Sequence, residues 1–344
     1  MGKLNEMRKR ERSVSKIRKL TRAMDLMSAA KLRDSRERQN RAHPFITQSA
    51  LTIAELVQRS PDLIRQMKYF YNFEDDDPYP IDIYLLTGDQ GLSGTFNDDI
   101  INLAKAFMSR CQSQLESEGH HDISFTIFCA GKQGRDRLID EGYKVMEDFS
   151  YSIEEPTYYK SMDLAEWVVD RARDGSARES FFFYSRIDSA ASTEELYTKV
   201  LPFDASSLLW LSQTRHEREA RLKATQRFVE SATRAAGLRV NEEAVAPETA
   251  RPEDSFGKLP FVIEGSEEKV MSYLVGTHVN ALVFGMLTET YASEQLQRMT
   301  LMESATRNAD ELLDQLRRER NQSRQGQITL ELNEIVSGAE SMKE

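Results

Sequence analysis

The sequence predicts an α/β protein whose two ends form one long antiparallel coiled coil. Three observations support this prediction. Apolar residues occur at heptad spacing near both ends of the 344-residue chain, proline is absent from the long C-terminal stretch, and strand and helix patterns alternate between the ends. We therefore expect an α/β domain of the Rossmann-like type, inserted between the two helices of the coiled coil.

Residues 266–344 are predicted to form the C-terminal helix. A helix of this length would extend roughly 115 Å at 1.5 Å per residue, far more than a compact domain needs. Its first apolar series steps by three and four residues and predicts a seam, the row of side chains that meets a partner helix: Met302, Ala305, Ala309, Leu312 and Leu316. A second seam is predicted out of phase, after a polar stretch: Ile328, Leu332, Ile335, Ala339 and Met342. We interpret recurring charged residues as excluding a membrane span.

Residues 1–59 are predicted to form the N-terminal helix, with a bend or pause near Pro44. Its predicted seam, which Glu11 interrupts, consists of Leu4, Met7, Val14, Ile17, Leu20, Met24 and Met27. Residues 1–41 contain 14 Lys and Arg against 5 Asp and Glu, a net charge of +9 on a chain of net charge −10. This helix therefore suits acidic partner surfaces, and the acidic whole argues against nucleic acid as the main partner.

Residues 81–211 are predicted to form the α/β domain, between a linker at 60–80 and a charged insertion at 212–265. The predicted strands are 81–87, 123–129 and 180–184, and the predicted helices are 96–115, 132–140 and 162–173. Their alternation indicates a largely parallel sheet. Asn97 is expected to cap the first of these helices.

The glycine loop at residues 88–94 is the first candidate for an enzymatic site. It lies between a strand and a helix, but its G-x-x-G-x-x-G spacing differs from the dinucleotide-binding pattern, and it lacks the Gly-Lys-Ser/Thr of a P-loop. We interpret it as a structural turn. Cys111 and Cys129 are expected to lie in the core, and the five histidines show no ligand spacing. The sequence predicts no catalytic residue, no metal site and no cofactor.

Three blocks of sequence carry a resemblance to a known family. They are KIRKLTRAM at 16–24 with MSAAKLR at 27–33, TGDQGLSGTFN at 87–97, and ITLELNEIVSGA at 328–339. Together they resemble the gamma subunit, the central rotor shaft, of F-type ATP synthases. Gln90, Ser93 and Thr95-Phe96 depart from the family pattern and indicate a divergent branch.

The resemblance implies that the coiled coil turns inside a ring of three alpha and three beta subunits, which hold the nucleotide sites. Rotation would couple transmembrane ion flow to ATP synthesis or hydrolysis. The α/β domain would contact the epsilon subunit and the membrane rotor ring, as a peripheral part of the F1 sector at the cytoplasmic face of the bacterial inner membrane. The chain itself would be neither catalytic nor membrane-spanning. Proton and sodium coupling both stay open.

The resemblance also implies contacts for individual residues. Arg324 and Gln325 match the pair that hydrogen-bonds a loop of the catalytic beta subunit, and a guanidinium and an amide suit such lateral contacts. Met24 matches a shaft position that faces beta through a mostly apolar contact. The alternative is a coiled-coil scaffold with an inserted α/β module unrelated to ATPases, which we would expect to form stable homodimers.

Overall fold

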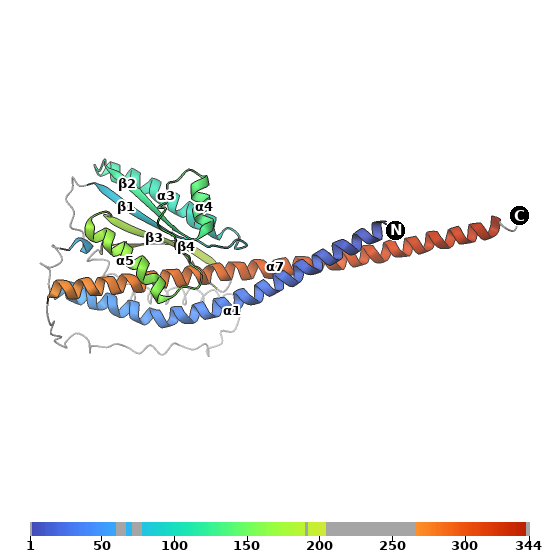
Figure 1. Cartoon of the computed structure of the whole chain (residues 1–344), viewed down its shortest axis with the longest axis horizontal. Helices are drawn as coiled ribbons and strands as arrows, with labels where there is room; N and C mark the ends of the chain where they lie inside the picture. The colour runs from blue at the N-terminus through green and yellow to red at the C-terminus, as the bar shows by residue number, and fades with distance from the viewer. Residues whose placement is uncertain (1, 60–66, 71–77, 190–191, 204–265, 342–344) are drawn as a thin grey trace, which may run out of the picture.

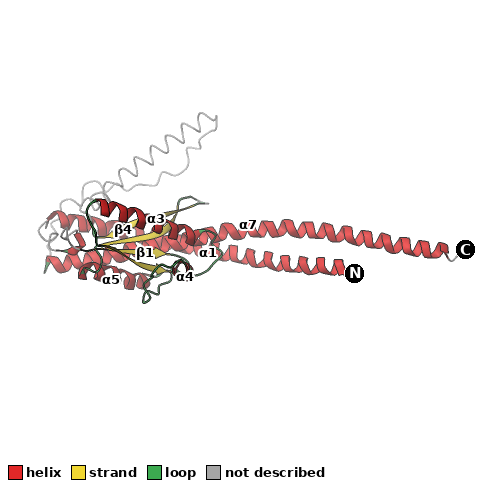
Figure 2. Ribbon diagram, turned by 90° about the horizontal axis from the view of Figure 1, so that it is seen from above, coloured by secondary structure: helices red, strands yellow, loops and turns green. Residues whose placement is uncertain are grey.

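Two long helices lying side by side are the largest feature of the computed structural model (Figure 1), which describes residues 2–59, 67–70, 78–189, 192–203 and 266–341. They are α1 (Gly2–Arg59) and α7 (Glu267–Ser341). The α/β domain packs against one end of this pair, and α7 continues past the start of α1 at the other end (Figures 1 and 2). The charged insertion predicted at 212–265 lies outside the described residues.

The two helices run antiparallel, as predicted. The residue numbers of the contacting residues on α7 fall as those on α1 rise. The pairs are Glu11 with Arg320, Thr21 with Thr306, Ser35 with Thr288, and Ser49 with His278. α1 contains Pro44 and is nevertheless one continuous helix, so the predicted pause is wrong. Proline costs a helix one donor, and the long contact with α7 compensates for that loss here.

The α/β domain contains a four-stranded sheet in the order β2-β1-β3-β4. The strands are β1 (Tyr79–Leu86), β2 (Ile123–Ala130), β3 (Glu179–Ile187) and β4 (Thr193–Leu201). β1 pairs in parallel with β2 and β3, and β4 runs antiparallel to β3 with a register shift between Ser180 and Phe181. The prediction of a largely parallel sheet is confirmed, but the sequence analysis missed β4.

Three longer helices and a short 3-10 turn, η1 (Lys68–Phe70), complete the domain. The helices are α3 (Phe96–Ser117), α4 (Lys132–Asp140) and α5 (Tyr158–Asp174). Phe107 of α3 packs on Phe181 and Phe183 at one face of the sheet. On the other face, Trp167 of α5 meets Phe128 of β2. α5 and β3 in turn contact α7, so the sheet is fixed to the long helix.

The first part of α7, which lies against the α/β domain, is a core helix. Residues 270–288 contain no charged residue, so our argument from recurring charges was wrong for this stretch. By length and composition alone, α7 contains a window that could cross a membrane, and half of that window is buried inside the protein. Val275, Val279 and Val283 are fully buried in the main hydrophobic cluster. Their burial explains the missing charges, because an unpaired charge in this core would be costly.

Candidate coupling surfaces of the two-helix shaft

The face of α1 that meets α7 matches the predicted seam at Val14 and departs from it farther along the helix. Its buried residues follow heptad steps and are mostly polar: Val14, Thr21, Ser28, Leu32 and Ser35. Leu20 is 61% exposed and Met27 is 57% exposed, so the prediction that these two lie in the seam is wrong. Glu11, which we treated as an interruption, belongs to the contact, because Arg320 of α7 donates to its carboxylate at 2.6 Å.

The facing residues of α7 agree better with the prediction. Met302 and Leu316 are buried, and Leu312 packs, partly buried, against the cluster of Val14, Ala309, Leu313 and Leu316. Thr306 is buried where we expected the neighbouring Ala305, which is only half-buried. Met302, Ala309 and Leu316 are thus buried as predicted, and at the other two positions the buried residue is the next one along the chain, Thr306 and Leu313.

Side-chain hydrogen bonds, to other side chains and to the backbone, hold much of the contact between α1 and α7. The hydroxyls of Thr21 and Thr306 lie 2.7 Å apart, and Ser35 donates to the carbonyl of Thr288 at 2.9 Å. Arg18 forms an ion pair with Asp310. Such bonds contribute about 1 kcal/mol each, less than the ~1.5–3 kcal/mol of a buried leucine. The hydrogen bonds of the seam therefore fix its alignment more than they supply stability.

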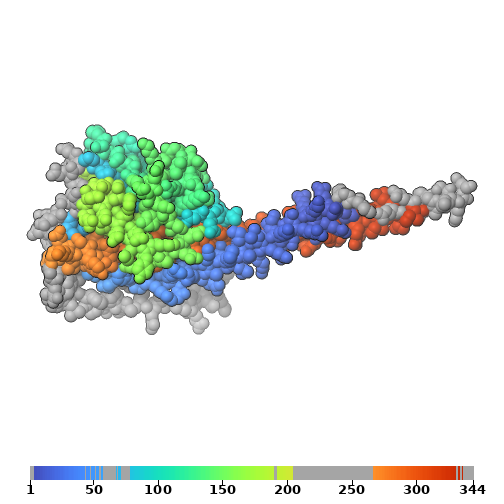
Figure 3. Space-filling model, viewed as in Figure 1, coloured from blue at the N-terminus to red at the C-terminus, as the bar shows by residue number. Residues whose placement is uncertain are grey.

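Apolar residues that α1 does not use against α7 form a continuous row on its outer side. We call Ile17, Leu20, Met24 and Met27 the outer stripe. Ile17, Leu20 and Met27 are each more than half exposed, and Met24 is half-buried. Their steps of three, four and three residues keep them on one helical face. Figure 3 shows the first part of α1, in dark blue, on the slender part of the molecule. Contiguous exposed apolar surface of this kind indicates a partner.

The end of α7 beyond the seam is exposed. Arg324 and Gln325 are exposed, as a lateral contact with another subunit requires. The second predicted seam is exposed too, at 48% for Ile328, 56% for Leu332 and 67% for Ile335. Within the described residues these side chains are not buried against α1, so the prediction that they meet a helix of this chain is wrong.

The glycine loop at 88–94 lies against α7. Arg298 of α7 donates to the carbonyl of Gly91 at 3.3 Å and forms an ion pair with Glu294 at 2.6 Å. Burial raises the pKa of the Glu294 carboxyl, and the arginine opposes this shift. Side chains of α7 pack against this loop, which agrees with its interpretation as a structural turn. Sequence analysis assigned no role to these two charges, although Glu294 and Arg298 stand out just beyond the uncharged stretch.

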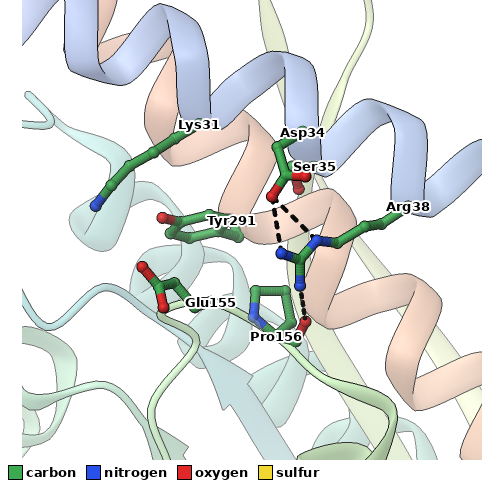
Figure 4. A pocket seen from close by; sticks show the side chains of 7 residues that line it. All are labelled: Lys31, Asp34, Ser35, Arg38, Glu155, Pro156 and Tyr291. Carbon is green, nitrogen blue, oxygen red and sulfur yellow. Dashed lines mark hydrogen bonds and ion pairs between the residues drawn. The ribbon is translucent and has the colours of Figure 1, made fainter.

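A cleft of about 160 Å³ lies where α1, α7 and the loop before α5 meet (Figure 4). Its walls are Lys31, Asp34, Ser35, Arg38, Glu155, Pro156 and Tyr291. Arg38 bridges the walls, since it contacts the Asp34 carboxylate at 2.8 Å and donates to the carbonyl of Pro156 at 3.1 Å. Among the described residues no group of three acidic, histidine or cysteine side chains could hold a metal ion. The cleft is a junction between shaft and domain.

Comparison with known proteins agrees with this architecture. A family model described as ATP synthase matches residues 3–342. The ATP synthase gamma chain of Acetivibrio thermocellus is 27% identical over 343 residues, covering 100% of both chains. The sodium ion specific ATP synthase gamma chain of Acetobacterium woodii is 26% identical over 340 residues, covering 98% of each.

Among solved structures, a chain of the mitochondrial ATP synthase of Euglena gracilis superposes with a TM-score of 0.51. The match covers 99% of this chain and 95% of that chain at 17% identity, which supports the fold alone. The family match, in contrast, spans both long helices and the domain between them. The chain therefore belongs to the ATP synthase gamma family.

Proposed function

We propose that this chain is the central shaft of an F-type ATP synthase and turns inside a ring of three alpha and three beta subunits. The outer stripe is the observation that carries the proposal. A two-helix rod with polar contacts inside and apolar side chains outside is unusual for a protein surrounded by water. It suits a rod enclosed by other subunits, since smooth apolar contact resists rotation less than fixed hydrogen bonds do.

Two further sites would transmit force to the ring. Arg324 and Gln325 lie exposed on α7 beyond the seam, and we infer that they hydrogen-bond a loop of a beta subunit. Met24, in the outer stripe, would face beta through an apolar contact. The guanidinium of Arg324 offers several donors in fixed geometry, so it can hold a carboxylate of the loop at one rotational position.

The α/β domain would form the foot of the rotor. We infer that it contacts the epsilon subunit and the membrane rotor ring, as a peripheral part of the F1 sector at the cytoplasmic face of a bacterial membrane. The chain would act as a non-catalytic subunit, with the nucleotide sites on alpha and beta.

Native mass spectrometry of the tagged chain, purified gently from its own source, tests the proposal. One copy with three copies each of two nucleotide-binding subunits is the expected result. A homodimer without such subunits would refute it and favour the scaffold alternative. The scaffold alternative has less support, because a homodimer would have to cover both the outer stripe of α1 and the exposed end of α7.

The contact at Arg324 is tested in the same complex. Arg324→Ala should lower ion pumping per ATP hydrolysed by about tenfold, because a charge-assisted contact contributes roughly 1.5–3 kcal/mol. Arg318→Ala is the matched control, since Arg318 is also exposed on α7 but lies on a different helical face. Equal losses in the two variants would remove the special role of Arg324.

A further inference from the structure

The carboxyl end of β1 is where ligands bind in many open α/β sheets. β1 lies between β2 and β3 in the sheet, and both pair with it in parallel. The strand order reverses at β1, since the chain goes from β1 to β2 on one side and then to β3 on the other, and the crevice at the carboxyl ends of strands at such a point is the usual binding position. In this protein the loop that follows β1, residues 88–94, meets α7 there. The shaft helix therefore occupies the ligand position of the domain.

Gly88 allows this approach. A Cβ atom at residue 88 would lie 2.5 Å from Oε1 of Glu294, closer than real Cβ contacts. The amide of Gly88 donates to Oδ1 of Asn97 at 2.8 Å, which holds the loop against the start of α3. Asn97 therefore supports this loop and is not the helix cap that the sequence predicted, since Thr95 precedes the first helical residue.

Arg298 completes the contact. Its Nη2 atom lies 2.6 Å from Glu294 Oε1 and donates to the carbonyl of Gly91 at 3.3 Å. Both side chains are buried, Glu294 at 1% and Arg298 at 5% exposure. A buried ion pair contributes little net stability but has a strict geometry, because its partners must match in distance and direction. One glycine, one carboxylate and one guanidinium thus determine how the loop sits on the helix.

We propose that Gly88, Glu294 and Arg298 form a lock that fixes the α/β domain to the shaft and carries torque between them. The proposal rests on the proposed function, since torque matters only in a rotor. α5, β3 and the hydrophobic cluster that the domain shares with α7 hold the domain on the shaft. The lock adds groups with one permitted arrangement where α7 meets the loop after β1, and so restricts the domain's angle further.

Substitution of two glycines in one loop tests the lock in the assembled enzyme. Gly88→Ala places a methyl group against the Glu294 carboxylate, whereas Gly91→Ala adds a methyl group that meets nothing within 4 Å. The subunit ring is immobilised and held with a nucleotide analogue, and a bead on the α/β domain reports its angular fluctuation. We expect the angular variance to rise about two- to tenfold in Gly88→Ala and to stay unchanged in Gly91→Ala.

A milder variant keeps the test decisive if Gly88→Ala fails to assemble. Arg298→Lys preserves the charge beside Glu294 but loses the fork that reaches the loop carbonyls, and it should raise the variance in the same direction. ATP hydrolysis by the ring should remain normal in every variant, while pumping falls. Unchanged variance in Gly88→Ala and Arg298→Lys would overturn the lock. Failure of the unaltered chain to assemble with a ring would instead refute the proposed function.

Discussion

His278 makes the junction between the two long helices sensitive to acid. It is fully buried on α7, its Nδ1 atom lies 2.8 Å from the hydroxyl of Ser49 on α1, and its ring packs on Phe203. Nε2 is buried without a hydrogen-bond partner among the described residues. Burial lowers the pKa of this imidazole from 6.5 to about 4. The folded protein therefore holds His278 neutral where the unfolded chain would protonate it.

The sign and size of the effect follow from this difference. A depressed pKa in the folded state contributes stability that is complete above pH 6.5 and is lost as the pH falls toward 4. At 1.36 kcal/mol for each unit of pKa, the free energy of unfolding should fall by about 3 kcal/mol across this interval. The loss is a substantial part of the ~5–15 kcal/mol that stabilises an ordinary domain.

Urea unfolding of the full chain at several pH values between 4 and 7 measures the effect. His278→Gln removes the titrating group and keeps an amide that can pair with Ser49, so the difference between parent and variant isolates His278. The comparison is needed because Glu179 acts in the opposite direction. Parallel pH profiles in parent and variant would refute the assigned burial of His278.

Three other predictions concern the foot and the shaft. Burial raises the pKa of Glu179 to about 7. Its protonated carboxyl therefore contributes stability that is complete below pH 4.5 and is lost as the pH rises through 7. Glu179→Gln should flatten the dependence of the unfolding free energy on pH in this interval. Leu20→Ser combined with Met27→Ser should change the free energy of unfolding of the isolated chain by less than about 0.5 kcal/mol but weaken its assembly with the ring. The buried residue Leu313 is the contrast, since Leu313→Ala should lower the free energy of unfolding, measured in urea, by about 2–5 kcal/mol. Met24→Lys should lower the ratio of ion pumping to ATP hydrolysis, because a lysine would make polar contacts in a smooth apolar surface.

Most elements of the α/β domain could be predicted from the sequence because each carries a local signal. The helix predicted at 132–140 matches α4 at both ends. β1 begins two residues before the predicted strand and ends one residue before it does, and β2 extends one residue past its prediction. β4 was missed because its side chains alternate only weakly between buried and exposed. It is an edge strand, and its place depends on pairing with β3 rather than on its own pattern.

The contacts of the shaft were harder to predict because burial depends on the partner helix. Thr21 and Ser28 look like surface residues in a heptad analysis, yet they are 8% and 2% exposed. Small polar side chains can be buried where two helices approach closely and a hydroxyl finds a partner across the contact. The lock at Gly88 was equally invisible, since no local pattern shows that Glu294 lies against a loop some 200 residues earlier in the chain.

The apolar periodicity of α1 was correctly detected, but of its residues Val14 packs on α7 while Ile17, Leu20 and Met27 lie exposed. A heptad series indicates that a helix face will be covered, but it does not indicate which molecule covers it. Leu20 and Met27 follow the spacing of a seam and lie exposed, while the polar row beside them meets α7. Two faces of one helix with two separate partners explain both facts. An exposed heptad row on a helix already paired along another face is therefore evidence for an enclosing assembly, and the outer stripe supports the proposed ring independently of sequence similarity.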